Sequence, residues 1–183
     1  MKKTLLFALA LAVISVVGVD AQVPDLEEVR VLAEQGDAIA QYNLGLMSAS
    51  GRGVPEDDVE AVRWFRLAAE QGLAPAQYGL GFMYETGEGV SEDDVEAVRW
   101  YRLAADQGYA TAQYNLGNRY ANGEGVPEDD LLAYMWWNLA AAQGNETAQS
   151  NKAQAESRMT RDQIAEAQRM STEWIEAHPP GAN

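Results

Sequence analysis

The stretch Gln41-Tyr42-Asn43-Leu44-Gly45 decides the fold, because it returns twice along the chain. It recurs as Gln77-Tyr78-Gly79-Leu80-Gly81 and as Gln113-Tyr114-Asn115-Leu116-Gly117, each copy 36 residues after the previous one. Residues 37–72 and 73–108 are identical at 25 of 36 positions, and residues 109–144 follow the same pattern more loosely. A fixed period of this length is typical of repeat proteins, in which each repeat stacks on its neighbours.

Each repeat predicts two helices joined by a loop. The first, here named the A helix, has one face formed by Ala40, Leu44, Met47 and Ser48. Gly51 and Gly53 end it, and a second pattern follows, here named the B helix, which is formed by Ala61, Trp64, Phe65, Ala68 and Ala69. Gly72 stands where a left-handed glycine ends a helix, and the same position recurs as Gly36, Gly108 and Gly144.

Stacked helix pairs of this kind predict an all-α fold, an α-solenoid of antiparallel helix pairs with N- and C-terminal capping helices. Thr160-Arg-Asp-Gln163 has the form of a capping box and predicts the start of the last helix. We expect a signal peptide at 1–21, a capping helix at 22–36, repeats at 37–72, 73–108 and 109–144, a degenerate repeat with a second capping helix at 145–178, and a disordered tail at 179–183.

The first segment has the pattern of a secretory signal peptide. Lys2 and Lys3 precede an apolar run from position 5 to 19, and the run is followed by the small residue Ala21. This run is shorter than the roughly 20 residues that span a bilayer as a helix. We therefore expect cleavage after Ala21, a periplasmic or secreted protein and no membrane insertion after cleavage; the alternative is an uncleaved anchor.

Charge and composition exclude several classes of function. The chain carries 13 basic and 28 acidic residues, a net charge of −15, so it repels phosphate backbones and we expect no nucleic-acid partner. It has no cysteine, and its single histidine, His178, lies in a Pro-rich tail, which argues against thiol, serine-histidine or histidine-metal chemistry. A carboxylate pair such as Glu85 and Glu88 leaves hydrolysis formally open, but we expect no enzyme and no cofactor.

Three other recurring features favour structural roles. The acidic clusters at 56–58, 92–94 and 128–130 lack calcium-loop spacing and instead predict caps at the starts of the B helices. The tryptophans Trp64, Trp100 and Trp136 recur at one position of the repeat, which indicates packing. Arg63 and Arg99 follow Glu60 and Glu96 by three residues, and with Arg66 and Arg102 they predict a solvated helix face with ion pairs.

The second repeat resembles the Sel1-like repeat family in a highly specific way. The matching residues are Ala76, Leu80-Gly81, Tyr84, Gly87-Glu-Gly89-Val90, Asp93, Ala97, Trp100-Tyr101, Ala104-Ala105 and Gly108. The resemblance covers about residues 24–158 and implies a right-handed solenoid related to tetratricopeptide repeats, with A helices lining the concave side. It also implies an adaptor in signalling, envelope assembly or host contact. Some exported relatives are cysteine-rich and linked to β-lactam binding or hydrolysis, but this chain has no cysteine.

The side of the A helix opposite its core face is the predicted partner-binding surface. It varies between copies while the tryptophan position is fixed, and variable positions are free to serve a particular ligand. Exposed tyrosines beside asparagines suit a peptide, although a solvated face with tyrosines partly buried between repeats is the alternative. The predicted residues are Tyr42, Asn43, Leu46, Tyr78, Phe82, Glu85, Tyr114, Asn115 and Asn118.

These observations predict a monomeric, non-catalytic periplasmic scaffold or regulator. Its partner would be a peptide or helix of another envelope protein, held in the concave groove. Two alternatives stay open at this point, namely a cell-wall-related binding protein or hydrolase acting on β-lactams or peptidoglycan, and a purely structural envelope protein.

Overall fold

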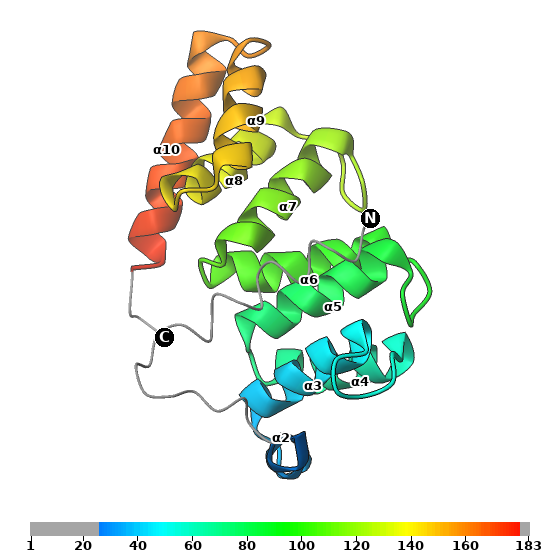
Figure 1. Cartoon of the computed structure of the whole chain (residues 1–183). Coiled ribbons are helices and arrows are strands. Elements are labelled where there is room, and N and C mark those ends of the chain that lie inside the picture. Colours follow the sequence, from blue (N-terminus) through cyan, green and yellow to red (C-terminus); the bar gives the residue numbers. More distant parts are fainter. Residues whose placement is uncertain (1–25, 180–183) are drawn as a thin grey trace. The chain divides into compact units, whose positions relative to one another are not determined.

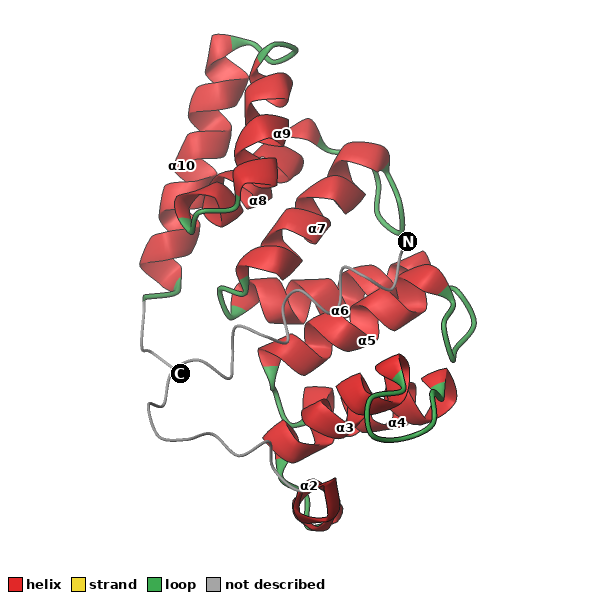
Figure 2. Ribbon diagram, viewed as in Figure 1, coloured by secondary structure: helices red, strands yellow, loops and turns green. Residues whose placement is uncertain are grey.

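A computed structural model describes residues 26–179 of the chain. The predicted signal peptide and residues 180–183 of the predicted tail therefore lie outside the described residues. Between residues 26 and 179 the structure consists of helices and loops, with no strand (Figure 2). The chain forms two compact units, one ending at Glu92 and the other beginning at Asp93, so the boundary falls inside the second repeat.

The first unit contains helices α2 to α5 (Figure 1). Their bounds are α2 (Leu26–Glu34), α3 (Ala38–Ser50), α4 (Asp58–Glu70) and α5 (Ala74–Thr86). The A helix α3 packs against α2 and the B helix α4, and α4 also packs against α5. Val29 and Ala33 of α2 join Ala40, Leu44 and Trp64 in one buried cluster. The lone helix α2 thus covers the side of α3 that has no preceding repeat.

The second unit contains helices α6 to α10. Their bounds are α6 (Asp94–Asp106), α7 (Ala110–Asn122), α8 (Asp130–Ala142), α9 (Glu146–Glu156) and α10 (Arg161–Ala177). Helix α7 packs against α6 and α8, and α8 also packs against α9 and α10. The rings of Trp136 on α8 and Trp174 on α10 meet edge to face, with centroids 6.0 Å apart. Consecutive helix pairs confirm the predicted all-α class in both units.

Helix starts and ends follow the predicted signals. Each B helix begins at an aspartate whose side chain accepts a hydrogen bond from a backbone N–H of the first turn; these are Asp57, Asp93 and Asp129. The acidic clusters are therefore helix caps, as predicted. Gly72, just after α4, has a φ of +89°, a backbone conformation that side chains with a Cβ rarely adopt. The glycine at this position therefore fixes the turn from a B helix into the next A helix.

The last helix begins with the predicted capping box. The Thr160 hydroxyl accepts a hydrogen bond from the Gln163 backbone N–H, and the Gln163 side chain accepts one from the Thr160 backbone N–H. Ala167 and Ser171 form the buried side of α10. The Ser171 hydroxyl lies 3.5 Å from the Met135 carbonyl oxygen and 2.9 Å from that of Ala167. This contact seats α10 on α8.

Candidate partner-binding site

The residues that stay the same in every repeat pack between its helices. Trp64, Trp100 and Trp136 are all buried, which confirms that the recurring tryptophan is a packing residue. Gly45 lies so close to the Phe65 ring that a Cβ there would come within 2.6 Å of it. Gly117 lies equally close to the Trp137 ring, at 2.6 Å. Because these A-helix glycines have no Cβ, the aromatic ring of the B helix can pack directly against the A-helix backbone.

A recurring glutamine ties each A helix to the B helix before it, a role that sequence reasoning missed. The side-chain amides of Gln41, Gln77 and Gln113 donate to the carbonyl oxygens of Ala33, Ala69 and Ala105, at 3.1, 3.2 and 3.1 Å. All three glutamines are buried. Gln41 and Gln113 also accept hydrogen bonds from Gln71 and Gln143 at the end of the following B helix. The invariance of this glutamine in all three copies was the available signal.

The arginines of the B helices divide into two kinds. Arg63 and Arg99 pair with Glu60 and Glu96 at 2.6 and 3.0 Å, as the three-residue spacing predicted. Arg66 donates instead to the hydroxyl of Tyr84 on the next A helix, at 2.8 Å. Arg102 and Tyr120 make the same contact. Arg102 is exposed, as the predicted solvated face requires, and Arg66 is half-buried; each also binds a tyrosine 18 residues later in the chain, a contact that the spacing did not predict.

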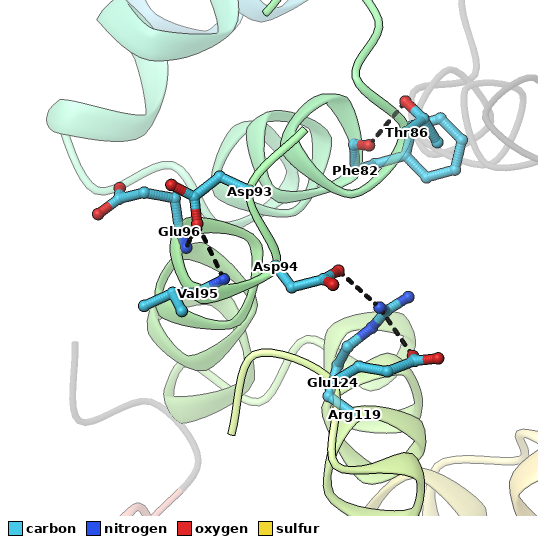
Figure 3. A network of polar contacts seen from close by, with 8 residues as sticks. All are labelled: Phe82, Thr86, Asp93, Asp94, Val95, Glu96, Arg119 and Glu124. Carbon is cyan, nitrogen blue, oxygen red and sulfur yellow. Dashed lines mark hydrogen bonds and ion pairs between the residues drawn. The ribbon is translucent and has the colours of Figure 1, made fainter. Parts of the chain in front are cut away.

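The third repeat places a charge where the other two have a core methionine. Arg119 occupies the position of Met47 and Met83, and its side chain is only 12% exposed. Its Nη1 atom lies 3.1 Å from Asp94 Oδ1 at the start of α6 and 2.8 Å from Glu124 Oε2 in the following loop (Figure 3). A buried guanidinium needs such carboxylate partners, so this network fixes the loop against α6 and α7.

In the first unit the predicted partner-binding residues differ in burial. Tyr42, Asn43 and Leu46 of α3 are half-buried, and the Tyr42 ring lies 5.9 Å from the Phe65 ring between centroids. Tyr78 and Phe82 of α5 are only 4% and 8% exposed. These two rings pack as apolar side chains do, so the expectation that they offer open surface to a partner is corrected.

Glu85 completes the predicted surface of the first unit, and Ile39 is an exposed residue beside it that was not predicted. Glu85, one turn after Phe82 on α5, is half-buried. Ile39 is 59% exposed and lies one turn before Asn43 on α3. It was not among the predicted residues, because proline and threonine stand at its position in the next two repeats. An isoleucine in the first turn of an A helix, outside its predicted core face, was the available signal.

In the second unit the predicted residues are Tyr114, Asn115 and Asn118 of α7, all half-buried. The side-chain oxygen of Asn118 accepts hydrogen bonds from Trp137 Nε1 at 3.0 Å and from Asn151 Nδ2 at 3.1 Å. Asn118 therefore fixes α7 to α8 and α9, which leaves Tyr114 and Asn115 as the better candidates for contact with a partner. Tyr109 is the residue immediately before α7, and burial raises the pKa of its hydroxyl.

None of the helices between residues 26 and 179 has the length and apolar character needed to cross a bilayer.

Comparison with known proteins identifies the repeat. The Sel1 repeat pattern matches residues 38–73, 74–109 and 110–145. A Sel1 repeat protein from Oxalobacter formigenes, known from its crystal structure, is 45% identical, with a TM-score of 0.66 over 71% of this chain and 98% of its own. No curated protein matches the chain significantly.

A second solved structure is that of c5321, a protective antigen present in uropathogenic Escherichia coli strains that displays an SLR fold. It is 28% identical, with a TM-score of 0.67, and the match covers 98% of this chain. The chain spans only 46% of that structure. Proteins built from Sel1-like repeats generally mediate protein–protein interactions and are typically non-catalytic scaffolds. With three consecutive copies of its repeat, this chain belongs to the Sel1 repeat family.

Proposed function

We propose that this protein is an exported, non-catalytic scaffold that binds a peptide or helix of another envelope protein through the variable side of its A helices. The observation that carries the proposal is the exposure of Ile39, 59%, beside half-buried Asn43 and Leu46 on α3. Stacking accounts for the fixed positions of the repeat, but it does not require an exposed isoleucine here. Apolar area next to an amide is suited to holding a peptide by burial and hydrogen bonding together.

The same side of α7 offers a second contact region in the other unit. Tyr114 and Asn115 are half-buried, as are Tyr42 and Asn43 at the equivalent positions of α3, so both units present the same pair of side chains there. The two regions differ at Ile39, which corresponds to Thr111 on α7, and matched apolar and polar groups confer specificity for a partner segment.

Site-specific photo-crosslinking tests the surface. The full chain carries a photoreactive amino acid at Ile39, Asn43 or Asn115, with exposed Arg158 of the α9–α10 turn as the control position. We expect one envelope protein to crosslink from the three A-helix positions and not from Arg158. Ile39→Asp should weaken crosslinking from Asn43 by about tenfold, since a carboxylate opposes burial of the apolar contact. Equal yields from all four positions would contradict the proposal.

Export is tested separately. We propose that residues 1–21 direct the chain across the inner membrane and are removed after Ala21. Mass spectrometry of the protein released by osmotic shock should then show Gln22 as its first residue. Recovery of full-length protein with Met1 in the cytoplasmic fraction would refute export while leaving the crosslinking result valid.

A further inference from the structure

The B helices carry exposed apolar side chains that stacking does not explain. Val59 on α4 and Val95 on α6 occupy the same position of the repeat and are 67% and 63% exposed. Two turns later, Leu67 and Leu103 are 37% and 40% exposed. On each of these helices, the exposed valine and leucine form a short apolar ridge suited to contact with another surface.

On α6 this ridge borders a hollow, here named the α6 hollow. Its volume is about 370 Å³, and Gly125 and Val126 of the α7–α8 loop are among its lining residues. A Cβ on Gly125 would come within 2.2 Å of the Asp94 carbonyl oxygen, so the loop lies directly against the start of α6. The α6 side chains that line the hollow are Val95, Val98, Arg99, Arg102, Leu103 and Asp106.

The equivalent face of α8 shows what such a surface can hold. Met135 and Leu139 stand 36 residues after Arg99 and Leu103, and they are only 6% and 3% exposed. Helix α10 packs on α8, with its Ser171 hydroxyl 3.5 Å from the Met135 carbonyl oxygen. The fold therefore already seats one amphipathic helix on a B helix, and the corresponding face of α6 is open to solvent.

Charge distinguishes the two faces. Where α8 has Met135 and Asn138, α6 has Arg99 and Arg102, two of only 13 basic residues in a chain of net charge −15. Arg99 pairs with Glu96, and Arg102 donates to Tyr120. A guanidinium has five N–H donors, so each can bind a further carboxylate. Asp106 also lines the hollow, but the arginines outnumber it. Carboxylates beside the apolar side chains of an occupying helix would therefore complement Arg99 and Arg102.

We propose that the α6 hollow binds an acidic amphipathic helix of a partner protein. Apolar side chains of the helix cover Val95 and Leu103, and its carboxylates contact Arg99 and Arg102. This surface lies on a B helix and is separate from the A-helix residues of the proposed function. One chain could therefore join two different partner segments.

A peptide pair tests the proposal on the full-length protein. The acidic probe has the sequence of residues 161–177 with Arg161 and Arg169 replaced by glutamate, and its basic twin has lysine at every acidic position of that segment. We expect the wild type to bind the acidic probe at least about tenfold more tightly than the basic twin, measured by fluorescence anisotropy. The double variant R99Q/R102Q should lose about tenfold in affinity for the acidic probe, and Leu103→Asp should abolish binding.

Matched controls locate the effect. R158Q/R161Q removes the same charge from two exposed arginines outside α6 and should bind as the wild type does. Ile39→Asp, which tests the A-helix surface, should also bind the acidic probe normally, so failure of one proposal leaves the other unaffected. Thermal melts by circular dichroism verify that each variant is folded.

Four results would overturn the proposal. They are no binding of the acidic probe at about 1 mM, equal binding of the two peptides, normal binding by R99Q/R102Q, and sedimentation data showing self-association that Leu103→Asp removes. The last result would identify a second copy of the chain as the occupant of the α6 hollow.

Discussion

Gly45 and Gly117 illustrate how single residues set the spacing between the helices of a repeat. In each case an aromatic ring from the B helix of the same repeat, Phe65 or Trp137, occupies the place where a Cβ would lie. Gly79, also inside an A helix, differs because a Cβ there would lie 3.4 Å from Phe65, an ordinary contact distance. Two kinds of helical glycine therefore occur in one chain, one required by packing and one not.

We predict opposite effects of alanine at these two kinds of position. Gly117→Ala should lower the free energy of unfolding by about 1–3 kcal/mol, because the Trp137 ring must shift to make room. Gly79→Ala should raise it by roughly 0.5–1 kcal/mol, because alanine favours the helix and Asn43 and Asn115 show that its position accepts a side chain. Urea denaturation of both variants measures the difference. Equal destabilisation would show that the Trp137 contact does not limit packing.

At the scale of the element, the B helix combines a cap, a buried stripe and an exposed ion pair. On α4, Asp57 caps the helix, Trp64 and Phe65 are buried, and Glu60 pairs with Arg63 across the exposed side. Hydrogen bonds from Arg63 hold the pKa of the Glu60 carboxyl below its ordinary value of 4.5, against the opposing effect of burial. The side chains of the pair are 40% and 51% exposed, so its contribution to stability is small.

The pH dependence of this pair follows from the direction of the pKa shift. Because the folded pKa of Glu60 is lower than the unfolded one, the pair stabilises the fold above about 4.5 and ceases to do so as the pH falls through the folded pKa. Glu60→Gln should therefore lower the free energy of unfolding by about 0.2–0.5 kcal/mol near pH 7. Urea titrations of wild type and variant should converge below the folded pKa. A constant difference at all pH values would indicate a role for Glu60 other than ion pairing.

Elements and fold class could be predicted from this sequence because repetition tests each local pattern three times. The caps at Asp57, Asp93 and Asp129 and the buried tryptophans followed from residue type and position alone. Tyr78 and Phe82 could not be placed in the same way. One helix face can be half-exposed in one repeat and buried in the next, and only the packed neighbours determine which occurs. Arg119 was missed because an arginine at a core position requires Asp94 and Glu124, whose approach depends on the folded loop.

For the whole molecule, the ends of the repeat array need separate protection. Helix α2 covers α3 at one end, and α10 covers α8 near the other. Trp136, Met135 and Leu139 of α8 are all buried, and α10 contacts this helix through Trp174 and Ser171. Repeats without such caps expose their apolar sides to solvent.

Deletion of residues 160–183 should therefore destabilise the protein. We expect a loss of about 3–5 kcal/mol in the free energy of unfolding, comparable with truncating one large buried side chain, together with a greater tendency to aggregate. The measurement is a thermal melt with light scattering, and deletion of residues 180–183 alone is the control. If the two truncated proteins melted at the same temperature, α10 would not be a cap.

The glutamine contacts have a consequence for how such chains change in length. Each of Gln41, Gln77 and Gln113 donates to an alanine carbonyl eight residues earlier, on the preceding B helix. The donors Gln77 and Gln113 lie 36 residues apart, and so do their acceptors Ala69 and Ala105. Unequal recombination between equivalent positions of two repeats therefore inserts or removes a copy with its donor and acceptor intact. Recombination in any other frame leaves a buried amide without its acceptor. Gene duplication can thus adjust the number of repeats without new compensating mutations.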